Sequence, residues 1–189
     1  TWKRDRIKPL ALDAGGESGY DNSWGWTTPI LLSQHDSNTL YVGSNRLFRL
    51  TAKGNDWELL GPDMTRADRE RPEPEKGSTS YHAIYSIAES PRTGDVLWTG
   101  SDDGLVWVSR DRGKTWTNVT ANFPKGSPTR CFVSTIAASY HADATAYVTY
   151  DCHHRDDYGP HVYKTADFGK TWSAITSGLP ADGGSLTVF

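Results

Sequence analysis

The feature that most constrains the fold of this 189-residue chain is a short motif that occurs twice. Residues 109–116 and 165–172 both fit the pattern S/T-x-D-x-G-x-T-W. Residues 51–57 form a degenerate third copy that is one residue shorter and has Lys53 in place of the Asp. The copies are 59 and then 56 residues apart, measured between Gly54, Gly113 and Gly169. Recurrence at such a period indicates an architecture in which each repeat is one supersecondary unit.

Each period holds four short runs rich in aromatic and β-branched residues, separated by Gly, Asp, Asn and Pro. In the middle copy we predict strands at 84–89, 96–101 and 105–109, and a fourth that begins at 115. The other two copies repeat the pattern at 27–32, 39–43, 46–50 and 57–60, and at 132–138, 144–150, 161–165 and 171–175. A four-stranded unit repeated radially is a blade, so the sequence predicts an all-β chain that forms a β-propeller segment.

Three blades do not close a ring, because propellers have about 4–8 of them. We predict one propeller segment over residues 1–189, with blades at 24–61, 81–121 and 131–178. Residues 1–23 and 181–189 are expected to belong to flanking blades or connections. Uncovered blade faces expose apolar surface, so we expect further blades of a larger propeller, or other protein chains, to cover them. A free three-blade chain is the remaining alternative.

The repeated motif resembles the Asp-box, or bacterial neuraminidase repeat, which lies in the turn between the third and fourth strands of a blade. In such a turn the Asp side chain accepts backbone N–H groups, the Gly permits a positive φ, and the Trp packs between blades. The resemblance therefore implies structural rather than catalytic roles for Asp111, Gly113, Trp116, Asp167, Gly169 and Trp172.

Wider stretches resemble the bacterial glycosyl-hydrolase-like proteins that carry this repeat and are related to the sortilin-type propeller. The resemblance extends over residues 24–180 and is carried by residues 29–33, 43–49, 98–106, 116–120, 165–172 and 178–180. The repeat marks a scaffold, so this resemblance implies a fold and no particular activity.

Charge and hydropathy exclude two classes of partner. The 20 Lys and Arg residues against 23 Asp and Glu give a net charge of −3, which is not the basic surface of a nucleic-acid-binding protein. No apolar run approaches the ~18 residues that a membrane span needs. We expect no cofactor. Other protein chains, the missing blades or a carbohydrate are the expected partners.

The longest connections, at 61–80, 121–130 and 151–160, are predicted to lie on the face opposite the motif turns. Loops presented by a rigid scaffold often carry function, so this face is either a binding surface or solvated decoration. Two groups are candidates for ligand or partner binding: Trp24, Trp26, Tyr81 and His82 near the channel mouth, and His153, His154, Arg155 and Asp156 in the last connection. The aromatic residues of the first group either stack on sugar rings or pack at blade junctions.

We assign no catalytic residue and no metal ligand, and the sequence offers only weaker candidates for each. Carboxylates and imidazoles at Asp151, His153, Asp156 and Asp157 suit a metal ion, but adjacent extended residues point to opposite sides. Asp102 and Asp103 precede Gly104, which indicates a plain tight turn, with an acid that faces the channel as the alternative. Glycoside hydrolysis needs two carboxylates, and the sequence identifies no partner for this acid.

The two cysteines flank a predicted hairpin. If Ser139 lies opposite Ala144, then Cys131 and Cys152 lie directly opposite each other at the open end. We therefore predict a disulfide, which indicates a periplasmic or extracellular location.

These observations favour an extracytoplasmic binding or scaffold module, a protein-interaction subunit or part of a larger assembly, over an enzyme, because the motif, turns and core explain most of the sequence. The alternative is a carbohydrate-active glycoside hydrolase or lyase that has further blades.

Overall fold

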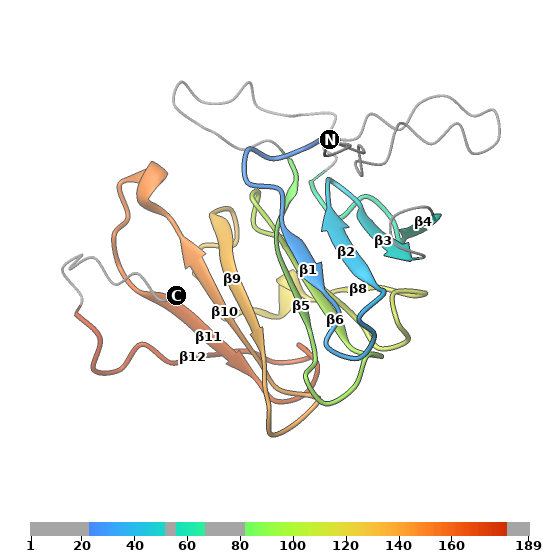
Figure 1. The fold of residues 1–189 in the computed structure, drawn as a ribbon. Coiled ribbons are helices and arrows are strands. Elements are labelled where there is room, and N and C mark those ends of the chain that lie inside the picture. The colour runs from blue at the N-terminus through green and yellow to red at the C-terminus, as the bar shows by residue number, and fades with distance from the viewer. Residues whose placement is uncertain (1–22, 52–55, 67–81, 181–189) are drawn as a thin grey trace, which may run out of the picture.

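The computed structural model describes residues 23–51, 56–66 and 82–180, which form three sheets of four antiparallel strands each (Figure 1). In every sheet the strands are paired in chain order. The first sheet contains β1 (Ile30–Leu32), β2 (Leu40–Gly43), β3 (Leu47–Thr51) and β4 (Asp56–Leu60). The second contains β5 (Ile84–Glu89), β6 (Leu97–Ser101), β7 (Val106–Ser109) and β8 (Thr117–Asn118). The third contains β9 (Phe132–Ala138), β10 (Ala146–Asp151), β11 (His161–Thr165) and β12 (Ser173–Ala174). The predicted all-β fold of four-stranded propeller blades is confirmed.

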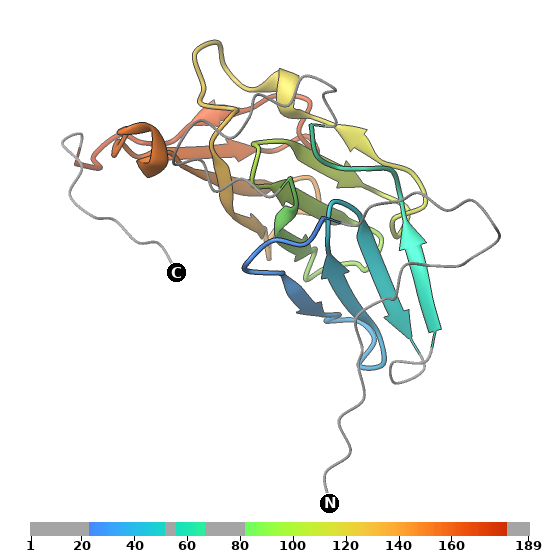
Figure 2. The same cartoon turned by 90° about the horizontal axis from the view of Figure 1, so that it is seen from above.

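The sheets fan out from their first strands, so that β1, β5 and β9 lie side by side and the later strands spread outward (Figure 2). The middle sheet therefore has a neighbour on each face. Its strand β6 is buried at all five positions, whereas β10 in the third sheet alternates between buried and half-buried residues. A strand covered on both faces reads as a continuous buried run, and one covered on a single face alternates.

Apolar side chains fill both junctions between the sheets. Between the first and second sheets, Leu47, Leu60, Met64 and Leu97 are buried together. Between the second and third, the ring of Phe123 stacks on that of Trp172 at 4.4 Å between centroids. Aromatic pairs in this range contribute energy beyond the apolar area that they bury.

The fourth strands of the second and third blades are shorter than the sequence predicts, whereas β4 is one residue longer than the predicted 57–60. We expected the two shorter strands to start at Thr115 and Thr171, but β8 and β12 begin two residues later. The reason is that both threonines donate their backbone N–H groups to the motif carboxylates of Asp111 and Asp167. Those N–H groups are therefore not available for pairing with the neighbouring strand.

The disulfide prediction is confirmed, although the register behind it is right at only one end. Cys131 and Cys152 are bonded, with their Cα atoms 5.0 Å apart. Near the turn, Thr149 pairs with Thr135, one position away from the predicted pairing. A bulge between Thr149 and Tyr150 shifts the register by one residue, so that Tyr150 pairs with Val133 as predicted. The bulge thus brings the cysteines opposite each other.

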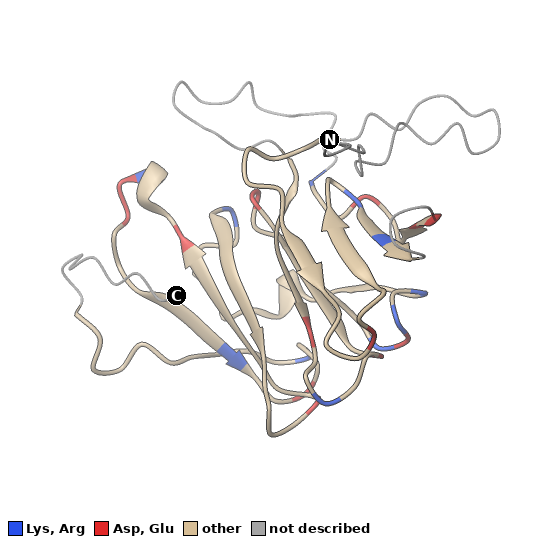
Figure 3. Cartoon of the chain, viewed as in Figure 1, with Lys and Arg blue, Asp and Glu red and all other residues tan. Residues whose placement is uncertain are grey.

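Charged residues of both signs lie mainly on turns and strand ends of the described blades (Figure 3). The ion pair between Arg92 and Asp143, 2.9 Å apart, is an example that joins turns of two neighbouring sheets. Such exposed pairs contribute little to stability. No helix in the described ranges is long and apolar enough to cross a membrane.

Candidate functional site

The motif turns lie at one end of the blades and use their carboxylates internally. Asp111 accepts the N–H of Thr115 at 2.8 Å and its hydroxyl at 2.6 Å. Asp167 accepts the N–H of Thr171 at 2.9 Å and its hydroxyl at 2.7 Å. These hydrogen bonds from the threonines hold the pKa of both aspartates below the usual range. Residues 52–55 of the degenerate copy lie outside the described ranges.

The same turns pack closely against the preceding blade. Gly113 has a φ of +86°, and a Cβ atom there would lie 2.9 Å from the side chain of Leu60. Gly169 has a φ of +79° and equally close contact with Val119. Positive φ and close approach both favour glycine. Each motif turn therefore joins its own blade to the one before it.

A pocket of about 260 Å³ opens at the opposite end of the blades, and we call it the groove. Its lining comes from all three blades: Gly25, Trp26, Thr27, Ala83, Ile84, Tyr85, Asp102, Phe132 and His154. Trp26 is 88% exposed. The rings of Tyr85 and Phe132 lie 5.6 Å apart, and those of Phe132 and His154 lie 5.2 Å apart. Aromatic rings therefore form a row across the innermost strands β5 and β9.

Asp102 is the acidic residue of this lining. Its carboxylate accepts the backbone N–H of Ala83 at 3.0 Å. Asn45 does the same in the first blade, where its side-chain oxygen accepts the N–H of Ser23 at 3.1 Å. A neutral amide thus fulfils this structural role in the first blade, and Asp102, which is 3% exposed, fulfils it in the second while it lines the groove.

Asp103 is buried in a separate network. It accepts the N–H of Arg66 at 2.6 Å and the hydroxyl of Ser101, and its carboxylate lies 3.2 Å from the ring of His82. Buried carboxylates need such partners. Asp103 and His82 therefore stabilise the β6–β7 turn. Asp102 is likewise buried and also has a structural hydrogen bond, but it is the one of the two adjacent acids that lines the groove.

The structure also separates the aromatic residues that were predicted to lie together near the channel mouth. Trp26 lies in the groove, whereas Trp24 stacks on Phe48 at 6.1 Å in the first blade. Tyr81 lies outside the described residues. Tyr85 and Phe132 were not predicted as site residues, because strand alternation gives the side of a sheet on which a residue lies but not the neighbouring blade that it meets.

The connection after β10 carries the second predicted group. It forms a short 3-10 helix, η3 (His153–Arg155), which ends at Asp156 in the left-handed region with a φ of 56°. His154 contributes to the groove, while Arg155 and Asp156 are exposed. The ring of His153 lies 2.6 Å from the carboxylate of Asp151. Of these residues, the structure brings only His154 to the groove.

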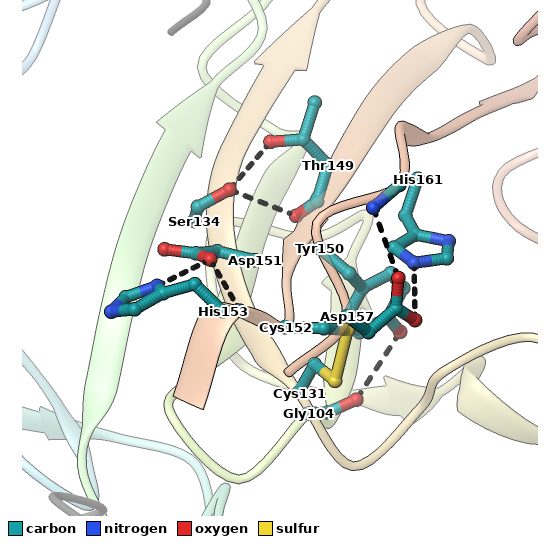
Figure 4. The surroundings of a disulfide bond; sticks show 11 residues. Gly104, Cys131, Ser134, Thr149, Tyr150, Asp151, Cys152, His153, Asp157 and His161 are labelled. Atoms are coloured by element: carbon teal, nitrogen blue, oxygen red, sulfur yellow. Dashed lines mark hydrogen bonds and ion pairs between the residues drawn. A yellow bond between two sulfur atoms is a disulfide. The ribbon is translucent and has the colours of Figure 1, made fainter. Parts of the chain in front are cut away.

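The predicted metal-binding set is not the one that the structure assembles. Asp151 and His153 pair with each other, whereas Asp157 turns to His161, 2.8 Å away, at the start of β11 (Figure 4). Within the described ranges, the group with three potential ligand atoms inside 4.8 Å is Cys152, Asp157 and His161. It shares only Asp157 with the predicted set, because the path of the loop, rather than its order, decides which side chains meet.

Comparison with known proteins identifies similar proteins without assigning a family. No family model matches the chain. An oligoxyloglucan-reducing end-specific xyloglucanase of Emericella nidulans is 24% identical over 177 residues, which cover 92% of this chain and 20% of the relative. This chain therefore spans about a fifth of the length of that curated relative.

Among solved structures, an ancestral GH74 enzyme superposes with a TM-score of 0.57 at 14% identity, over 82% of this chain and 18% of that one. YCF48 bound to D1 peptide gives a TM-score of 0.49 at 18% identity, over 78% of this chain and 40% of that one. At this level of identity the first likeness establishes the fold alone. The three four-stranded sheets and this likeness together make the chain a β-propeller segment.

Proposed function

We propose that this chain is part of an extracytoplasmic β-propeller that binds a ligand in the groove without cleaving it. The observation that carries the proposal is the groove itself. This open pocket is lined by Trp26, which is 88% exposed, and by the row of Tyr85, Phe132 and His154. An exposed large aromatic residue at a concave site is typical of ligand recognition.

The ligand class that we propose is a carbohydrate chain. Aromatic faces stack on the C–H faces of sugar rings, and Asp102 is a polar member of the same lining. The Emericella relative is a xyloglucanase, and this likeness supports the carbohydrate class because it extends over most of this chain.

Binding is favoured over hydrolysis because of the carboxylates. Glycosidases use two carboxyl groups about 5–9.5 Å apart, on either side of the bond that is cleaved. Asp102 is the acid of the described groove lining, and the partners of Asp103 hold that carboxylate in the turn. The described residues thus supply one acid where two are required.

The assembly and location complete the proposal. The Cys131–Cys152 disulfide favours an oxidising compartment, periplasmic or extracellular. The first and third sheets flank the middle one, and we propose that further blades or other chains cover their outer faces, with 1–23 and 181–189 contributing to them. We also assign the motif turns to the Asp-box type, on the hydrogen bonds of Asp111 and Asp167.

Isothermal titration with xyloglucan oligosaccharides tests the binding function. We expect Trp26→Ala to weaken affinity about tenfold, the effect of removing ~1.4 kcal/mol of stacking. Tyr140→Ala is the matched control, because Tyr140 is 72% exposed in the β9–β10 turn at the other end of the blade. Equal affinity of the Trp26 and Tyr140 variants, or no binding by the parent protein, contradicts the proposal.

Hydrolysis is the second candidate, which the xyloglucanase relative and the position of Asp102 favour. Release of reducing ends from xyloglucan measures it. Asp102→Asn is a suitable variant, because Asn45 fills the corresponding place in the first blade. Cleavage that is lost in Asp102→Asn and kept in Asp111→Asn supports hydrolysis, and binding without cleavage supports the first proposal.

A further inference from the structure

Four side chains with metal-binding chemistry meet at the groove end of the third blade. Cys131 precedes β9, Cys152 follows β10, and His161 begins β11, so three neighbouring strands carry them. Asp157 joins them from the connection between β10 and β11. The Sγ atom of Cys152, a carboxylate oxygen of Asp157 and a ring nitrogen of His161 lie within 4.8 Å of one another. Cys131 is bonded directly to Cys152 (Figure 4).

The surroundings hold these groups in place. Both cysteines are buried, at 5% and 3% exposure. One oxygen of Asp157 accepts the N–H of Gly159 at 3.0 Å, which leaves the other directed at the Nε2 atom of His161. The Gly159 N–H also holds the pKa of Asp157 below its usual range. A backbone donor behind a carboxylate is the kind of outer contact that orients metal ligands.

We propose that Cys131, Cys152, Asp157 and His161 bind a zinc ion when the disulfide is reduced. A disulfide sulfur is a poor ligand, whereas two thiolates, one imidazole and one carboxylate make a four-coordinate set suited to Zn²⁺. This corner of the blade therefore holds either a covalent cross-link or a metal ion, according to the redox conditions. The inference is independent of the function proposed for the groove.

The chemistry balances with a dithiol as reductant. The dithiol supplies two electrons and two protons, the bond between the Cys131 and Cys152 sulfurs breaks, and the reductant becomes a disulfide. Zinc then replaces the protons of the two thiols, which are released to solvent. The Nε2–H that donates to Asp157 gives its proton up to solvent while Nδ1 takes one from solvent, and the neutral ring then binds zinc through Nε2.

The required movement is small. Zinc bond lengths of about 2.0–2.3 Å place tetrahedral ligand atoms about 3.3–3.8 Å apart. The two sulfur atoms separate by side-chain rotation once their bond is broken, and the ligand atoms of Cys152, Asp157 and His161 already lie within 4.8 Å of one another. Zinc thus needs no new strand arrangement.

Cobalt binding to the protein reduced with a water-soluble phosphine tests the site, because Co²⁺ reports tetrahedral geometry and thiolate ligation in its absorption spectrum. We expect one Co²⁺ per chain, with a thiolate charge-transfer band that zinc removes, and no such band in the oxidised protein. His161→Ala is expected to weaken binding by at least ~100-fold, because even outer contacts account for about 10–100-fold.

His153→Ala is the matched control, since that exposed imidazole pairs with Asp151 outside the cluster, and it is expected to bind cobalt as the parent does. A folded, reduced protein without the thiolate band, or equal loss in both histidine variants, overturns the proposal. If reduction unfolds the chain, zinc is expected to restore the near-ultraviolet circular dichroism spectrum, and failure to restore it also overturns the proposal.

Discussion

The two ends of the blades differ in how far their side-chain contacts repeat from one blade to the next. At the motif-turn end, the second and third blades repeat the same side-chain hydrogen bonds, with Asp–Thr distances of 2.8 and 2.6 Å in one and 2.9 and 2.7 Å in the other. At the groove end each blade differs: Asn45 in the first, the Asp102–Asp103 pair in the second, and the disulfide with η3 in the third. The repeated end is a scaffold, and the end that varies can define a ligand site.

Among changes at the groove end, removal of the disulfide is expected to cause the largest loss of unfolding free energy. Its cysteines are 21 residues apart, a loop whose closure restricts the unfolded chain by about 3 kcal/mol. We therefore expect the Cys131→Ser/Cys152→Ser variant to lose about that amount of unfolding free energy in urea titrations. A loss similar to that of a motif-turn variant would remove this distinction between the ends.

The buried network of Asp103 gives the next effect. Asp103→Ala leaves the N–H of Arg66 and the hydroxyl of Ser101 without their acceptor, and we expect a loss of about 2–3 kcal/mol. The control is Asp143→Ala, which removes only the exposed pair with Arg92 and is expected to cost less than about 1 kcal/mol. Urea titrations measure both, and equal losses would show that the network contributes nothing special.

Substitutions in the two motif turns are expected to cause smaller losses of unfolding free energy, equal in the two copies. Asp111→Ala and Asp167→Ala each remove hydrogen bonds at a partly exposed turn, so we expect about 1 kcal/mol for each. Unequal values would show that the two copies are not interchangeable.

These turns also have a defined pH dependence. The pKa of each motif aspartate is lowered on folding from the ordinary 3.8, so the contribution is present above that value. It is lost as the pH falls through the lower, folded-state pKa. The difference in unfolding free energy between the parent and the double variant should therefore shrink below about pH 4. A difference that grows in acid would contradict this origin.

The smallest effect on stability is expected at Trp26. Its side chain is 88% exposed, so Trp26→Ala should change the unfolding free energy by no more than about 0.5 kcal/mol. Thermal unfolding measures this change. A larger loss would mean that Trp26 is a core residue, and a weaker affinity of that variant would then report misfolding.

The sequence predicted what depends on local pattern. The motif and the strand runs predicted three four-stranded sheets, because alternation and turn residues are local signals. The β9–β10 register was predicted one residue off near Thr149, because a bulge has no local signal there. The contact of Asp157 with His161 was not predicted, since it depends on how the loop folds. The contact of Tyr85 with Phe132 depends on blade packing.

Hydrogen–deuterium exchange, with and without a saturating xyloglucan oligosaccharide, tests the division between the two ends most directly. Bound ligand slows the opening of the backbone that it covers. We predict slower exchange in peptides that contain residues 25–27, 83–85, 132 and 154, and unchanged exchange at 109–116 and 165–172. Protection at the motif turns without protection at the groove would contradict the account.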